Sequence, residues 1–184
     1  PVPYLDGMVF RFCPNAAALE AAWSLGQLDG AGGLPAEAAA RLTAGGDARI
    51  IRYPSTTLFA VTLNLRPTHP QFRDAGVRVA LLQAIDRDAI VGSLLGGFAT
   101  RADGLIPSTS WAFDSDATTA IAYDPEAATA ALVAAGWKHA ADGGWIPKGG
   151  KDPLTIEIIS PLEEANPTAF GIAAAVAADW QAIG

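Results

Sequence analysis

The stretch from Phe72 to Gly97 reads FRDAGVRVALLQAIDRDAIVGSLLGG and predicts two consecutive helices. Asp74 suits a helix N-cap, because its carboxylate can accept hydrogen bonds from the free amides of a first helical turn. Apolar side chains then recur every four residues, which places Val77, Leu81 and Ile85 on one helix face. The first helix should therefore begin after Asp74 and pack through that face.

The second helix of this stretch should be short. Asp86 is a second N-cap candidate, and the pair Gly96-Gly97 can adopt the left-handed conformation that ends a helix. Before the helix pair, residues 58–65 alternate between apolar and small or polar side chains, as in a half-buried strand. A strand that leads into two helices indicates an α/β fold.

The remaining chain repeats this mixture. Helix starts are predicted at four positions, which are Asn15, Pro35, Asp124 and Asn166. Strands are predicted over residues 7–12, 48–53, 145–146 and 154–159, the last two as neighbours. The segment 54–57 is the best candidate for a domain boundary, and it divides the chain into residues 1–57 and 58–184.

Composition excludes some classes of partner. The 184 residues carry a formal net charge of −7 and show no lysine or arginine cluster, so a nucleic-acid partner is not expected. The single cysteine, Cys13, rules out an intrachain disulfide. The longest nearly apolar run, residues 169–178, is too short to cross a bilayer. The chain begins without Met and with no signal peptide, and we expect it to be an internal fragment of a longer protein.

No arrangement of residues in the sequence predicts catalysis, a cofactor or a metal. His69 and His139 lie in predicted loops, without carboxylates or thiols at ligand spacing. Ser93 lies within a predicted helix rather than on the sharp turn that exposes a nucleophile, and no glycine-rich phosphate loop is present. We therefore expect a protein that is not an enzyme.

Three residues are candidates for ligand contact. Trp111 lies in a predicted loop that does not need it for packing, although structural packing remains the alternative. Asn64 lies on the polar face of the strand predicted over residues 58–65. Ser160 follows the strand predicted over residues 154–159, near the start of the last helix, where ligands gather in open α/β sheets.

The motifs also resemble a known family. The run F-x-D-x-x-VR-x-AL-x-x-AIDR over residues 72–87 resembles the signature of the family 5 extracellular solute-binding proteins, the peptide, oligopeptide and nickel receptors of bacterial ABC importers. Four further segments resemble the same family in the same order: residues 3–12, residues 24–29, the GLIP motif at 104–107 followed by Trp111, and YDPE at 123–126 with its helix up to Trp137. The end of the last helix, residues 179–184, is similar too.

The resemblance implies part of a two-lobed periplasmic binding protein of type II, with mixed sheets and flanking helices. Residues 1–57 would belong to the lobe formed by both chain ends, and residues 58–184 would begin the second lobe. Such a protein captures a small solute, most typically a peptide, and delivers it to ABC permease subunits. It would be extracytoplasmic, in the periplasm or held to the membrane by a lipid anchor outside this fragment.

Two alternatives stay open. The same fold could be the ligand-sensing part of a transcriptional regulator or signalling protein, which sequence upstream of Pro1 would decide. A hydrolase would need a nucleophile and a base that the chain does not offer. The identity of the ligand is likewise undecided between a di- or oligopeptide, a nickel chelate, a sugar and an opine.

Overall fold

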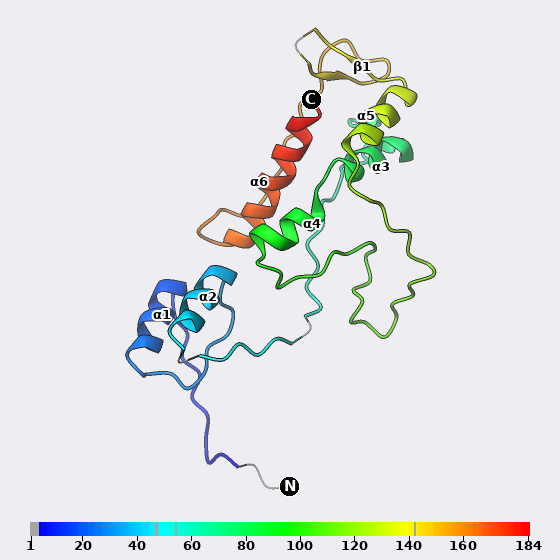
Figure 1. Cartoon of the computed structure of the whole chain (residues 1–184). Helices are drawn as coiled ribbons and strands as arrows, with labels where there is room; N and C mark the ends of the chain where they lie inside the picture. Colours follow the sequence, from blue (N-terminus) through cyan, green and yellow to red (C-terminus); the bar gives the residue numbers. More distant parts are fainter. Residues whose placement is uncertain (1–3, 47, 54, 142) are drawn as a thin grey trace. The chain divides into compact units, whose positions relative to one another are not determined.

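The computed structural model describes residues 4–46, 48–53, 55–141 and 143–184. The chain forms two compact units, Pro1–Arg52 and Tyr53–Gly184 (Figure 1). This division falls a few residues before the predicted boundary at 57/58, and the assignment of the two parts to different lobes stays a prediction. Among the described residues, no helix has both the length and the apolar character needed to cross a membrane.

The first unit contains two short helices, α1 (Ala16–Ser24) and α2 (Ala36–Ala44). The predicted cap of α1 is confirmed, because Asn15 Oδ1 accepts a hydrogen bond from the Ala18 amide at 2.9 Å. Arg41 of α2 donates to both carboxylate oxygens of Glu20 in α1, at 3.0 and 2.8 Å. This bidentate contact joins the two helices and lowers the pKa of Glu20 through the hydrogen bond and the attraction of the guanidinium.

The second unit is built on three helices, α3 (Ala75–Gln83), α5 (Pro125–Ala134) and α6 (Pro167–Ala182). A 3-10 turn, η1 (Pro70–Arg73), precedes α3. In Figure 1, α3 and α5 lie side by side, and α6 runs beside the turn that follows α3. The core of the unit consists of buried side chains from η1, from the three helices and from segments that follow them: Phe72, Val77, Ala80, Leu81, Ala84, Ile85, Ala128, Leu132, Trp137, Trp145, Val176 and Trp180.

The predicted N-caps of this unit are confirmed. Asp74 accepts a hydrogen bond from the Gly76 amide, Asp124 from the Ala127 amide and Asn166 from the Ala169 amide, at 2.8 to 2.9 Å. These bonds are local, since each cap contacts an amide two or three residues ahead.

The second helix of the opening stretch has an unusual form. After one α-turn, α4 (Arg87–Ala89), the chain continues as a π-helical turn, η2 (Ile90–Leu94). Asp86 caps α4 by accepting from the Ala89 amide at 2.8 Å. A Cβ added at Gly171 of α6 would lie 3.1 Å from Leu94 Cδ1, so the glycine permits η2 and α6 to approach closely.

Helix α6 is joined to the end of α3 by two polar contacts. The Trp180 indole N–H donates to the Leu81 carbonyl at 2.9 Å within the core. The Asp179 carboxylate accepts from the Asp86 amide, also at 2.9 Å. These bonds satisfy a carbonyl at the end of α3 and an amide at the start of α4, which would otherwise be unpaired.

The described residues contain one sheet, an antiparallel pair of β1 (Lys138–His139) and β2 (Trp145–Ile146). The strand predicted at residues 145–146 is confirmed, but its expected partner was wrong. It pairs with the preceding segment instead, and the segment 154–159 contributes one backbone hydrogen bond, from the Leu154 amide to the Trp145 carbonyl at 2.8 Å.

The expected mixed sheets are not formed by the described residues. Residues 7–12, 48–53, 58–65 and 154–159 were predicted as strands, and the structure assigns strand conformation to none of them. A strand requires a ladder of hydrogen bonds to a neighbouring strand, and in the described part of the chain only β1 and β2 form such a ladder. The side-chain alternation of 154–159 is nevertheless confirmed, since Leu154, Ile156 and Ile158 pack against the core while the residues between them are exposed.

Replacing Trp180 by phenylalanine should destabilise the second unit. Trp180 is 9% exposed, and the substitution removes the donor to Leu81 and leaves space around a smaller ring. We expect a loss of about 1–3 kcal/mol, measured by urea unfolding with circular dichroism. W111F alters an exposed indole and should leave the midpoint unchanged. Equal midpoints for W180F and the unmodified chain would contradict the prediction.

The Glu20–Arg41 contact should be visible in a titration. Because the folded pKa of Glu20 is lowered, the contact stabilises the unit above the ordinary carboxyl pKa of about 4.3 and is lost as the pH falls through the lowered value. NMR titration of the Glu20 side-chain carboxyl should give a midpoint below its ordinary value, and R41M should raise that midpoint. The same midpoint in both chains would refute this.

Candidate functional site

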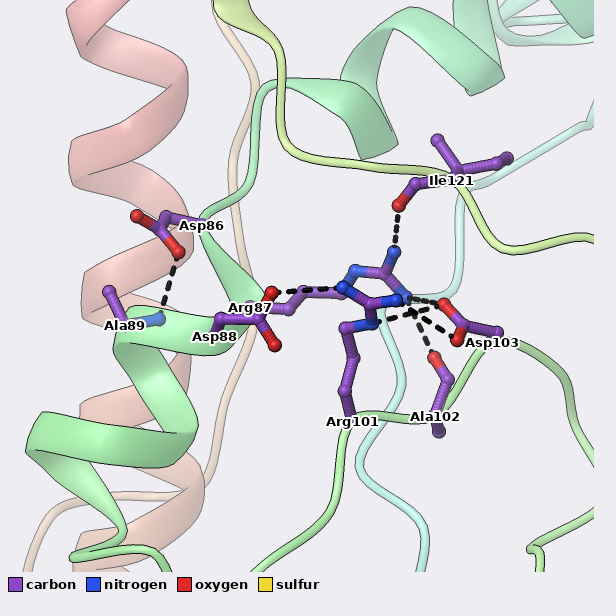
Figure 2. A network of polar contacts seen from close by, with 8 residues as sticks. All are labelled: Asp86, Arg87, Asp88, Ala89, Arg101, Ala102, Asp103 and Ile121. Carbon is purple, nitrogen blue, oxygen red and sulfur yellow. Dashed lines mark hydrogen bonds and ion pairs between the residues drawn. The ribbon is translucent and has the colours of Figure 1, made fainter.

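A single arginine holds the longest irregular segment of the second unit. Arg87 is the first residue of α4, and its side chain is 17% exposed. Its guanidinium donates to the Ala102 carbonyl at 2.7 Å, to Asp103 Oδ1 at 3.0 Å and to the Ile121 carbonyl (Figure 2). We call these three contacts the Arg87 clamp.

The clamp reaches both ends of one loop. Residues 102–121, which we call the 102–121 loop, contain no helix or strand, and in Figure 1 they extend away from α3 and α5 of the same unit. The Ala102 carbonyl lies at the start of this loop and the Ile121 carbonyl at its end. A planar guanidinium with several diverging donors can satisfy both carbonyls at once, which an ammonium group does less readily.

Arg101 and Asp88 complete the network. Arg101 Nη1 donates to Asp88 Oδ2 at 2.9 Å, and its Nε lies 3.3 Å from Asp103 Oδ1. The hydrogen bond to Asp103, followed by the attraction of the two carboxylates, raises the pKa of Arg101 above its ordinary value. Two arginines and two aspartates balance in charge, so the network is suited to holding the loop rather than to attracting an ionic ligand.

The loop presents apolar side chains to solvent. Trp111 is 98% exposed and Leu105 is 82% exposed, and Ile106 and Phe113 are exposed to a lesser degree. The backbone around Trp111 is held in turns, because the Ser110 amide donates to the Pro107 carbonyl at 2.9 Å and the Phe113 amide to the Ser110 carbonyl at 3.1 Å. The indole is therefore exposed on a hydrogen-bonded turn.

Asn64 lies beside an open surface depression. The depression has a volume of about 570 Å³ and is lined by residues 62–66. The Asn64 side-chain oxygen accepts from the Arg66 amide at 3.1 Å, which fixes the orientation of the amide group.

Ser160 is half-buried, and its hydroxyl donates to the Pro161 carbonyl at 3.1 Å. The last helix begins at Pro167, and its capping residue is Asn166 rather than Ser160. None of the hydrogen bonds or ring contacts in the described part of the chain joins any two of Asn64, Trp111 and Ser160.

The sequence alone does not mark Arg87 as a functional residue, because Arg87 stands there only as the last residue of the motif over residues 72–87. The available signal was an arginine directly after an N-cap aspartate, but this pattern does not reveal that the guanidinium contacts a distant loop.

The described residues contain no cluster of three or more His, Cys, Asp or Glu side chains that could hold a metal ion. The two histidines contact aromatic rings instead: His69 stacks on Phe72 with ring centroids 6.3 Å apart, and His139 lies against Trp145 at 3.7 Å.

Trp111 should account for most of the accessible tryptophan fluorescence of this chain. Trp137, Trp145 and Trp180 are buried and Trp23 is half-buried, whereas the Trp111 indole is almost fully in solvent. W111F should therefore remove the component that acrylamide quenches most strongly, while W137F should leave it. A quenching constant unchanged by W111F would contradict the observed exposure.

Comparison with known proteins gives a consistent family assignment. Residues 1–184 match the family described as bacterial extracellular solute-binding proteins, family 5, middle part. The chain is 34% identical over 112 residues to the dipeptide-binding protein of Escherichia coli, which covers 60% of this chain and 18% of that protein. It is 31% identical over 113 residues to heme-binding protein A of Haemophilus influenzae, covering 61% of this chain and 18% of that protein.

A putative ABC transporter peptide-binding protein of Brucella ovis is also similar, with 38% identity over 93 residues, 47% of this chain and 15% of that protein. The chain thus matches less than a fifth of the length of each of these relatives. No solved structure is similar enough to count as a match. Because the family match extends over all of its residues, this chain belongs to the family 5 bacterial extracellular solute-binding proteins.

Proposed function

We propose that these residues are part of the substrate-binding component of an ABC importer, which captures a peptide-like solute and delivers it to the membrane permease. The observation that carries this proposal is the family match over residues 1–184, together with relatives whose names denote binding proteins. The complete protein would have two lobes of the type II periplasmic binding-protein kind. It would act outside the cytoplasm, in the periplasm or through a lipid anchor.

The role requires binding and no covalent chemistry. In a two-lobed receptor, solute stabilises the closed form because it makes additional contacts there, and only this difference in affinity changes the population of closed molecules. A polar network whose charges balance and an exposed apolar turn are consistent with that role.

We assign Trp111 the role of an apolar contact for the solute. An indole that is 98% exposed on a hydrogen-bonded turn offers a large rigid surface at low entropic cost. Asn64 and Ser160 supply an amide and a hydroxyl, the groups that pair with peptide N–H and C=O groups. These three roles are part of the proposal.

Calorimetry on the complete protein that contains these residues tests the function. The titrants are Ala-Ala, Ala-Phe, tetra-alanine and hemin, the last because one relative is named as a heme-binding protein. We expect binding of at least one peptide by the complete protein, and weak or no binding by the 184-residue chain alone, because contacts from the remainder of both lobes are missing. Hemin binding without peptide binding, or tight peptide binding by the 184-residue chain, would contradict the proposal.

Substitution of Trp111 tests the assigned contact. W111A should weaken peptide binding by about three- to tenfold, because the stacking surface is lost. W111F, which keeps an aromatic ring, should recover part of that loss. Equal affinity of W111A and the unmodified protein for every bound peptide would exclude Trp111 from the site.

A further inference from the structure

The Arg87 clamp connects a helical part of the second unit with a loop that has no regular secondary structure. On one side lies α4, whose start is fixed by the Asp86 cap and by the bond from the Asp86 amide to Asp179 of α6. On the other side lies the 102–121 loop, which has no helix or strand of its own. Figure 2 shows the Arg87 guanidinium between the Ile121 carbonyl and the Ala102–Asp103 pair.

The contacts of Arg87 fix the two ends of the loop relative to one another. Closing a flexible loop costs conformational entropy, and contacts that join its ends restrict the conformations that the loop can adopt. The turns at Pro107–Ser110 and Ser110–Phe113 then fix the backbone near Trp111. The position of the indole therefore depends on local turns and on the clamp at the loop's base.

We propose that Arg87 is a positioning residue for solute capture: its guanidinium holds the 102–121 loop closed so that Trp111 is presented to the solute in an ordered position. The inference rests on the proposed function, since it requires Trp111 to contact the solute. Arg87 itself acts through the loop and touches no ligand.

The expected effect follows from the cost of ordering the loop. If the clamp is weakened, the loop must be ordered when the solute binds, and the affinity falls by that cost. Lysine keeps the positive charge but lacks the planar fork, so R87K should lose at least one of the two carbonyl contacts. We expect affinity to fall by about three- to tenfold, a range set by the usual cost of immobilising a few side chains.

Arg78 offers a matched control. Its guanidinium also donates to two backbone carbonyls, those of Phe72 at 2.9 Å and Arg73 at 2.8 Å, and neither of these bonds involves the 102–121 loop. R78K therefore makes the same chemical change at another guanidinium–carbonyl site of the second unit.

The experiment uses the complete protein and Ala-Phe, with Ala-Ala, tetra-alanine and hemin as parallel titrants. Hydrogen exchange should be faster across residues 103–120 in R87K than in the unmodified protein, with helices α3, α5 and α6 unchanged, and R78K should not affect the loop. Should R87K fail to fold, as shown by faster exchange in those helices, D103N is the second variant. It keeps the size of the partner side chain, weakens its contact with Arg87, and should accelerate loop exchange to a smaller degree.

A double-mutant cycle distinguishes positioning from a general structural effect. If Arg87 acts through Trp111, R87K should weaken Ala-Phe binding in the unmodified protein but have little further effect in W111A. The inference would be overturned if the losses of binding free energy in R87K and W111A were additive. It would also be overturned if hydrogen exchange in the 102–121 loop changed in neither R87K nor D103N.

The two proposals fail in different ways. Binding of Ala-Phe that is equal in R87K and the unmodified protein overturns the inference and leaves the proposed function intact. Absence of binding to Ala-Phe, Ala-Ala and tetra-alanine by the unmodified protein overturns the proposed function, and the inference with it.

Discussion

The attachment of α6 to the end of α3 is the constraint on which the second unit depends. The Trp180 indole reaches the Leu81 carbonyl across 99 residues of sequence, and Asp179 reaches the Asp86 amide across 93. These two bonds lie at the junction where α3 ends and α4 begins. Because Arg87 directly follows Asp86, this junction also sets the direction from which the Arg87 guanidinium approaches the 102–121 loop.

The packed core of the second unit thus also fixes the positions of residues outside the core. Close packing of Gly171 against Leu94 and burial of small side chains such as Ala80 and Ala128 bring the helices near one another. The polar network at α4 then holds the 102–121 loop, which has no helix or strand of its own. Because the positive and negative charges of this network balance, the network positions the loop and does not act as a site of net charge. Under the proposed function this arrangement is useful, since contact surfaces on loops require a rigid base.

Local features were predicted correctly because they depend on neighbouring residues. Asn15, Asp74, Asp86, Asp124 and Asn166 all cap the helices that the sequence indicated, since a cap bonds an amide within three residues of itself. The strands were predicted less well because they depend on distant partners. Residues 154–159 place their apolar side chains inward as the alternation indicated, yet they form no sheet, because periodicity specifies a face and not a neighbour.

In the candidate site, too, local features follow from the sequence and long-range contacts do not. The sequence by itself determined the helix starts, the apolar faces, the loop that carries Trp111 and, through ordered motifs, the family to which the chain belongs. Only the tertiary structure decided that Trp111 is exposed on an ordered turn and that Arg87 joins the two ends of its loop. The reason is physical: an N-cap or an amphipathic face is defined by neighbours along the chain, whereas the partners of a guanidinium are chosen by folding.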